Sequence, residues 1–258
     1  MIDWGIGHYE HTARELEPVA QHVVSLAEVK RGERVVDLAT GTGNAALLAA
    51  QAGGEVTGID RASRLIEVAR ERAAAEGLEA WFVLGDLEAL PFEDRSFEVA
   101  LSVFGLIFAA EASRAFGELM RVLRPGGRAH VSAWVPVGPI NAMVGEFVRA
   151  LATATGSAPK RFAWHDVVAV RELAAPHGAR VLVHEGQLQI TAASPEVYFE
   201  ANERQHPMSI AGQPVLEKAG TYAEVREKAL AILRQGNEDP KAFRVSSPYR
   251  ILEIHRPA

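Results

Sequence analysis

Residues 33–60 read ERVVDLATGTGNAALLAAQAGGEVTGID and specify two strands joined by a glycine-containing turn and a helix. Residues 34–38, RVVDL, predict a short buried strand, and the alanine- and leucine-rich segment 44–52 predicts a helix that packs against a sheet. Residues 56–60 predict a second strand. Together they form a βαβ unit whose turn follows the first strand, at the edge where open α/β sheets bind ligands.

The turn at residues 39–43 has the composition of a nucleotide-binding turn. Gly41 and Gly43 lack side chains, so a ligand can approach the backbone, and the following helix presents unpaired N–H groups. Asp60 ends the neighbouring strand, where its carboxylate can accept hydrogen bonds from a ribose diol. We therefore expect a cofactor that contains adenosine.

Two cofactor classes fit this pattern. Gly41, Gly43 and Ala46, followed by Asp60, also satisfy the loose nicotinamide-dinucleotide fingerprint. Asp37 favours the other class, because a carboxylate near the turn suits a cofactor that carries an ammonium and a sulfonium better than a pyrophosphate.

The segment VVDLATGTGN, residues 35–44, resembles the first motif of class I S-adenosylmethionine-dependent methyltransferases. The branch it is most similar to contains quinone-biosynthesis C-methyltransferases and other small-molecule enzymes. One departure is Ala39, where this family usually has glycine. The extra methyl group is tolerated if the backbone torsion at this position is an ordinary one. Residues 121–128, RVLRPGGR, between a predicted helix and a predicted strand, also look like this branch.

The resemblance implies a Rossmann-like α/β fold, a seven-stranded mostly parallel sheet with helices on both faces and a helical cap. We expect one domain overall, divided into a lid and cofactor-binding core at 1–135, a helical insertion at 136–179 and the end of the sheet with a second helical insertion at 180–258. Apolar periodicity predicts a long helix over 12–29 before the first strand. A buried strand is predicted over 97–104, and a final strand over 243–255.

The resemblance also implies a set of cofactor-binding residues. An acid at Asp86 would bond the adenine amino group, and the backbone of Leu87 would reach a ring nitrogen. Ser102 and Val103 would face the methionine moiety, and Phe104 would border the substrate. The complete expected set is Tyr9, Asp37, Ala39, Thr40, Gly41, Gly43, Asp60, Arg61, Gly85, Asp86, Leu87, Ser102 and Val103. Tyr9 belongs to an aromatic segment that either plugs the edge of the core or, as in similar methyltransferases, closes over the cofactor as a lid.

Composition excludes several other functions. The 258 residues carry a formal charge of −6 and no long basic run, so nucleic acid is not an expected partner. The chain has no cysteine, which excludes disulfides, thiolate metal sites and a cysteine nucleophile. No secretion signal is apparent, and the longest apolar run, 99–110, is too short to span a bilayer. We therefore expect a cytoplasmic protein without a bound metal.

No catalytic residue can be chosen from the sequence. Methyl transfer from a sulfonium needs mainly contact between donor and acceptor, because the leaving group is already activated. Candidate bases are His8, His11, His165, His206, Tyr198, Glu200 and Glu203, of which the helical pair Glu200 and Glu203 could instead be solvated surface. Asp166 indicates a helix start, and His130 is expected to be a buried, hydrogen-bonded imidazole.

The sequence therefore predicts an enzyme that uses S-adenosyl-L-methionine to methylate a small, apolar or aromatic molecule. Two alternatives stay open at this point. One is a nicotinamide-dependent oxidoreductase, and the other is a binding protein that keeps the fold and the cofactor without catalysis.

Overall fold

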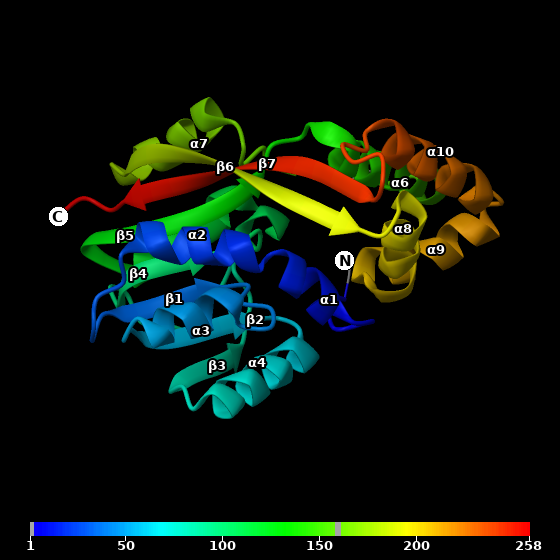
Figure 1. Ribbon diagram of the computed structural model, residues 1–258. Coiled ribbons are helices and arrows are strands. Elements are labelled where there is room, and N and C mark those ends of the chain that lie inside the picture. The colour runs from blue at the N-terminus through cyan, green and yellow to red at the C-terminus, as the bar shows by residue number, and fades with distance from the viewer. Residues whose placement is uncertain (1–2, 158–160) are drawn as a thin grey trace. The chain divides into compact units, whose positions relative to one another are not determined.

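The computed structural model describes residues 3–157 and 161–258, and its centre is a seven-stranded sheet in the order β3-β2-β1-β4-β5-β7-β6 (Figure 1). The strands are β1 (Arg34–Leu38), β2 (Glu55–Asp60), β3 (Ala80–Leu84), β4 (Phe97–Ser102), β5 (Leu123–Trp134), β6 (Arg180–Ala192) and β7 (Phe243–His255). The strands from β3 across to β5 pair in parallel, whereas β7 pairs with β5 antiparallel. The predicted mostly parallel sheet of seven strands is confirmed.

Helices precede, connect and follow these strands. They are α1 (Tyr9–Glu15), α2 (Glu17–Ala27), α3 (Asn44–Gln51), α4 (Ser63–Glu76), α5 (Ala112–Val122), α6 (Gly138–Thr155), α7 (Val167–Ala174), α8 (Pro195–Gln205), α9 (Pro207–Lys218) and α10 (Tyr222–Gln235). Short 3-10 turns lie at Leu106–Phe108 and Ala175–His177.

The chain divides into two compact units. The first, here called the sheet unit, contains residues 16–134, 161–186 and 249–258. The second, the helical unit, contains the described parts of 1–15 and 135–160 together with 187–248. Two of the boundaries fall within β6 and β7, so each of these strands contributes to both units.

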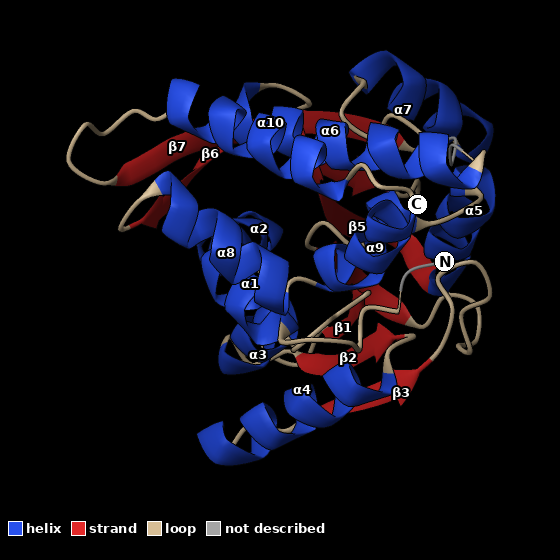
Figure 2. Cartoon of the chain, turned by 90° about the vertical axis from the view of Figure 1, so that its right-hand side faces the viewer, coloured by secondary structure: helices blue, strands red, loops and turns tan. Residues whose placement is uncertain are grey.

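The sheet unit has an apolar layer on each face of its strands. Alternation along β1 sends Val36 into a core that also contains Phe116 of α5 and Val170 of α7. Val35 points to the opposite face, beside the turn that follows α3. Helices α2 and α3 lie on one side of the sheet and α5 on the other (Figure 2). These two layers fix the carboxyl ends of β1, β2 and β4, from which the candidate site is built.

The helix predicted over 12–29 is two helices in the structure. α1 ends at Glu15, and α2 starts at Glu17 with Pro18 in its first turn. A proline has no N–H to continue the preceding helix, but its fixed φ suits the first turn of a new one. The interruption also coincides with the boundary between the helical unit and the sheet unit.

The helical unit is built mainly from α6, α8, α9 and α10. Gly212 of α9 allows a close approach to α6, because a Cβ there would lie 2.5 Å from a ring carbon of Phe147. Tyr198 of α8 stacks on Phe243 of β7 with ring centroids 5.1 Å apart. Among the described residues, none of the helices is long and apolar enough to cross a membrane.

Candidate functional site

The turn after β1 bends through three left-handed residues. Ala39, Gly41 and Gly43 have φ values of 52°, 56° and 86°. The φ angle of Ala39 therefore lies in the left-handed region, which favours glycine. This is the position at which the family usually has glycine. Thr40 anchors the bend through its N–H, which donates to the carbonyl of Ile59 at 2.9 Å.

Asp37 binds the turn itself. Its side chain is only 2% exposed, and Oδ2 accepts hydrogen bonds from the Thr40 hydroxyl at 2.6 Å and from the Ala46 N–H at 3.1 Å. Burial raises the pKa of this carboxyl to about 7, against the opposing effect of both hydrogen bonds. Asp37 thus ties the end of β1 to the turn and to the first turn of α3.

Asp60 links the same turn to the tip of β2. Its Oδ2 accepts from the Gly41 N–H at 2.9 Å, and its Oδ1 accepts from the Ala62 N–H at 2.9 Å. The residue is buried, and desolvation raises the pKa of its carboxyl. Each carboxylate oxygen can accept more than one hydrogen bond, so Asp60 keeps acceptor capacity for a pair of hydroxyl groups. This donor and acceptor set fits a ribose diol.

The loop after β3 is attached to Asp60 as well. The N–H of Gly85 donates to the Asp60 carbonyl at 3.0 Å, and a Cβ on Gly85 would lie 2.5 Å from a methyl carbon of Ile59. Asp86 follows as an exposed residue whose Oδ1 accepts from the Glu88 N–H at 2.9 Å. The structure therefore brings the turn after β1, Asp60 and the loop at Asp86 to one edge of the sheet.

The end of β4 completes this edge. Ser102 is fully buried, and its hydroxyl donates to the Leu38 carbonyl at 2.9 Å while accepting from the Leu106 N–H at 2.9 Å. The strand predicted over 97–104 ends here, because Phe104 takes a left-handed conformation with φ of 53°. The Phe104 N–H donates to the hydroxyl of Ser132 at 2.9 Å. The chain thus turns sharply where the methionine moiety is expected.

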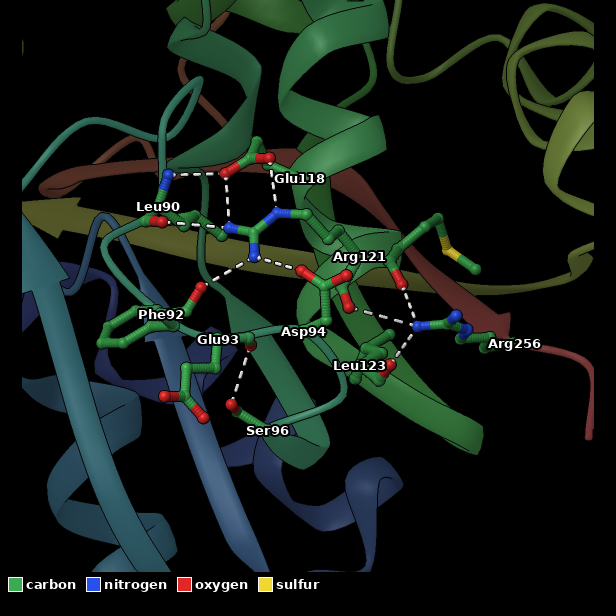
Figure 3. Close-up of polar contacts among 10 residues, drawn as sticks. Leu90, Phe92, Glu93, Asp94, Ser96, Glu118, Arg121, Leu123 and Arg256 are labelled. Carbon is green, nitrogen blue, oxygen red and sulfur yellow. Dashed lines mark hydrogen bonds and ion pairs between the residues drawn. The ribbon is translucent and has the colours of Figure 1, made fainter.

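Arg121 of α5 holds the loop that carries Asp86 against the sheet unit (Figure 3). Its guanidinium forms two 2.8 Å bonds with Glu118, one 2.8 Å bond with Asp94, and further bonds to the carbonyls of Leu90 and Phe92 at 3.0 and 2.7 Å. Glu118 in turn accepts the Leu90 N–H at 2.7 Å. A single planar fork thereby fixes two main-chain carbonyls and two carboxylates.

Two further residues of the expected site, Arg61 and Tyr9, make few contacts that bear on cofactor binding. Arg61 is exposed directly after Asp60, and its backbone N–H also donates to that carboxylate. Tyr9 begins α1 in the helical unit, where its ring meets Trp4 edge-on at 5.8 Å. The expected contact between Tyr9 and the cofactor stays a prediction.

One candidate base, Glu203, and the helix-start residue Asp166 have clear structural partners. Glu203 bonds the Tyr222 hydroxyl and the guanidinium of Arg226 within the helical unit. Asp166 caps α7 as predicted, accepting from the N–H groups of Val168 and Ala169 at 2.9 and 3.3 Å. Among residues 3–157 and 161–258, no group of three or more histidine and acidic side chains is placed to hold a metal ion.

His130 is buried as expected, but the hydrogen bond expected for it was wrong. Its ring is 1% exposed, and neither nitrogen has a hydrogen-bond partner among the described residues. Glu253 lies opposite His130 in the β5–β7 ladder, and its two carboxylate oxygens are already held by His184 and His255 at 2.6 Å each. Burial lowers the pKa of His130 to about 4, so the imidazole is neutral.

Sequence reasoning did not assign roles to Ser132, Tyr249 or His22. The Tyr249 hydroxyl and His22 Nδ1 are 2.8 Å apart, and Tyr249 lies opposite Trp134 in the β5–β7 ladder. No local motif marks these residues, because they meet only when α2 packs on the antiparallel end of the sheet. A tyrosine directly after Pro248 in a predicted strand was the sole signal available.

Comparisons with known proteins agree with this architecture. Residues 35–127 match the family described as "Methyltransferase domain". An uncharacterized protein of Mycobacterium tuberculosis is 35% identical over 188 residues, which cover 72% of this chain and 69% of that protein. A demethylmenaquinone methyltransferase of Thermus thermophilus is 43% identical over 118 residues, or 45% of this chain and 54% of the relative.

The fold has a close counterpart among solved structures. The YcgJ protein of Bacillus subtilis superimposes with a TM-score of 0.64 at 18% identity, covering 93% of this chain and 98% of the other. Fold, first motif and relatives agree, and the chain belongs to the class I S-adenosylmethionine-dependent methyltransferases. It is accordingly a methyltransferase, and its cofactor is S-adenosyl-L-methionine.

Proposed function

We propose that the chain transfers a methyl group from S-adenosyl-L-methionine to a small, apolar or aromatic molecule. The observation that carries the proposal is the 2.9 Å bond between the Gly41 N–H and Asp60 Oδ2. This bond joins the glycine turn after β1 to the acid at the end of β2. The two sequence motifs therefore lie together at one edge of the sheet. When bound there, the cofactor supplies a methyl group on a positively charged sulfur.

The geometry of that edge supports a set of proposed cofactor contacts. Asp60 would accept the ribose hydroxyls, and the exposed Asp86 with the backbone of Leu87 would bind the adenine. The methionine moiety would lie beside Ser102 and Val103. Asp37 would act indirectly, by holding the turn. The other proposed contacts are Tyr9, Ala39, Thr40, Gly41, Gly43, Arg61 and Gly85.

The nature of the acceptor is inferred from the side chains that follow β4 and β5. Phe104 and Trp134 stack with ring centroids 3.8 Å apart, next to the expected methionine end. The partly exposed indole of Trp134 supports an apolar or aromatic acceptor. The Thermus thermophilus relative, whose name is demethylmenaquinone methyltransferase, supports a quinone-like acceptor as the first candidate.

Binding of the cofactor is tested by isothermal titration calorimetry with S-adenosylhomocysteine and with NAD. We expect binding of S-adenosylhomocysteine only, and Asp60→Ala should weaken it by about 1.5–3 kcal/mol through loss of the charge-assisted bonds. Glu67→Ala, on the exposed side of α4, is a control that should leave the affinity unchanged. Binding of NAD alone would refute the assignment.

The acceptor class is tested by methyl transfer from radiolabelled cofactor. Reduced demethylmenaquinone and a set of small phenols are offered in parallel with protein and tRNA. We expect the label in the organic-soluble small molecules. Label confined to protein or tRNA would contradict a small apolar acceptor.

A further inference from the structure

Asp37 and Asp60 of the candidate site already accept hydrogen bonds from the protein itself. Asp37 is 2% exposed and accepts bonds from Thr40 and Ala46, and Asp60 accepts bonds from Gly41 and Ala62. Asp37 therefore offers little free negative charge to a cationic ligand. The sequence predicts that the charge of Asp37 attracts the positively charged cofactor. Because that carboxylate is already bonded, another group must stabilise the positive sulfur.

Three aromatic rings stand at the same edge of the sheet. Phe104 comes two residues after the end of β4, Trp134 ends β5, and Tyr249 pairs with Trp134 across the ladder. Phe104 and Trp134 stack with centroids 3.8 Å apart and planes 4° apart. The Tyr249 ring meets both nearly at right angles, with centroid separations of 6.0 and 6.5 Å. We call these three residues the aromatic cluster.

The cluster is held in place at some cost to the backbone. Phe104 has φ of 53°, a left-handed conformation that is strained for a bulky residue and persists only where the surroundings impose it. Its N–H is bound by the hydroxyl of Ser132, a residue that is fully buried. Strain of this kind next to a ligand-binding edge supports a functional role for Phe104.

The hydroxyl end of Tyr249 is equally constrained. It lies 2.8 Å from His22 Nδ1, and the ring packs directly over Gly186. A Cβ on Gly186 would come within 2.3 Å of the ring, so only glycine leaves room for it. Phe104 and Tyr249 are buried, whereas Trp134 is only half-buried and keeps part of its indole surface open.

We propose that the aromatic cluster recognises the positive charge on the sulfur and thereby distinguishes S-adenosylmethionine from S-adenosylhomocysteine. This inference rests on the cofactor site given under Proposed function. The faces of tryptophan, tyrosine and phenylalanine carry negative electrostatic potential and attract alkylated cations. Transfer of the methyl group leaves a neutral thioether, which gains nothing from this potential. The cluster therefore favours the substrate form of the cofactor over the product form.

The test is calorimetric titration of the full-length chain with each of the two cofactor forms. Trp134→Leu should weaken binding of S-adenosylmethionine by about three- to tenfold and change binding of S-adenosylhomocysteine by less than about twofold. Trp134→Phe keeps an aromatic face and should retain most of the preference. Equal losses for both forms, or no loss for either, would overturn the inference.

A second measurement avoids any change of shape. Replacing the chain's four tryptophans with increasingly fluorinated tryptophan weakens the negative potential of the ring while preserving its packing. The preference for S-adenosylmethionine should fall stepwise with fluorination, and a constant preference would overturn the inference. If the wild-type chain bound neither form of the cofactor, the proposed cofactor site itself would be refuted. Equal binding of both forms would instead refute only the role of the aromatic cluster.

Discussion

The methyl group of Ala39 lies against the backbone of Gly105. A Cβ built on Gly105 would be 2.5 Å from the Ala39 Cβ and 2.8 Å from the Leu38 carbonyl oxygen. Ala39 itself is left-handed, with φ of 52°. The turn after β1 thus packs closely against the turn after β4. The methyl group of Ala39 fits at this contact, but a second methyl group at position 105 would not.

This contact predicts coupling between two substitutions. Gly105→Ala should destabilise the chain by about 1–3 kcal/mol, since an added methyl in a packed site forces neighbouring atoms apart. Ala39→Gly removes the strain of a left-handed alanine, which stabilises the folded state by roughly 1–2 kcal/mol. Glycine also makes the unfolded chain more flexible, which costs about 0.5–1 kcal/mol in the free energy of unfolding. A small net stabilisation is therefore expected. The values come from urea unfolding of the single variants.

The double variant tests the contact directly. With glycine at position 39, one of the two close approaches to a Cβ at position 105 disappears, so the combined loss should be smaller than the sum by about 1 kcal/mol. Strict additivity of the two free-energy changes would show that Ala39 and Gly105 do not restrain each other.

The elements near β1 were predictable because their signals are local. Burial on both faces gives β1 its apolar run, and glycines at left-handed positions mark the turn, so residues 33–60 specify their own fold. The bounds of β7 were predicted as the structure shows them, because Phe243 to His255 alternates between buried and partly exposed residues. The proline at position 18 was visible too, but the apolar periodicity outweighed it in the prediction of a single helix.

The errors at the site come from contacts that the order of residues does not show. The sequence places Asp37 near the turn, but only the structure shows that Thr40 and Ala46 occupy one of its carboxylate oxygens. Phe104 continues an apolar run, yet its N–H is bound by Ser132 and the strand ends two residues earlier. The Phe104–Ser132 bond joins residues 28 positions apart, so it leaves no local pattern in the sequence.

His130 predicts a pH dependence of stability. Burial without a hydrogen-bond partner lowers its pKa to about 4 in the folded chain, from about 6.5 when unfolded. The unfolded state then binds a proton first, so protonation of His130 costs nothing above about pH 6.5, and stability falls as the pH drops towards 4, by up to about 3 kcal/mol. In His130→Leu this contribution is absent.

The comparison uses urea unfolding of both proteins between pH 4 and 8. Subtracting one curve of unfolding free energy against pH from the other removes the contribution of the carboxyl groups, which titrate in the same range in both proteins. The difference is the contribution of the His130 imidazole. His130→Leu should also be more stable than wild type at pH 7, by roughly 1 kcal/mol, because it removes two unsatisfied polar atoms. Parallel curves across the whole range would mean that His130 finds a partner in solution.

Arg121 should control the loop that presents Asp86 and Leu87. Arg121→Lys keeps the positive charge but loses the planar fork that binds Glu118, Asp94 and the carbonyls of Leu90 and Phe92. We expect a loss of about 2 kcal/mol in the free energy of unfolding.

Local and global effects can be separated by hydrogen exchange measured residue by residue. In Arg121→Lys the Leu90 amide, which donates to Glu118, should exchange faster, and the affinity for S-adenosylhomocysteine should fall because the loop carrying the adenine contacts is no longer fixed. Arg149→Lys is the matched control: its guanidinium pairs with Glu146 on an exposed helix surface, where such pairs contribute less than about 1 kcal/mol. If both substitutions changed stability and Leu90 exchange equally, Arg121 would be an ordinary surface arginine, and the order of the Asp86 loop would have to come from the strands on either side of it.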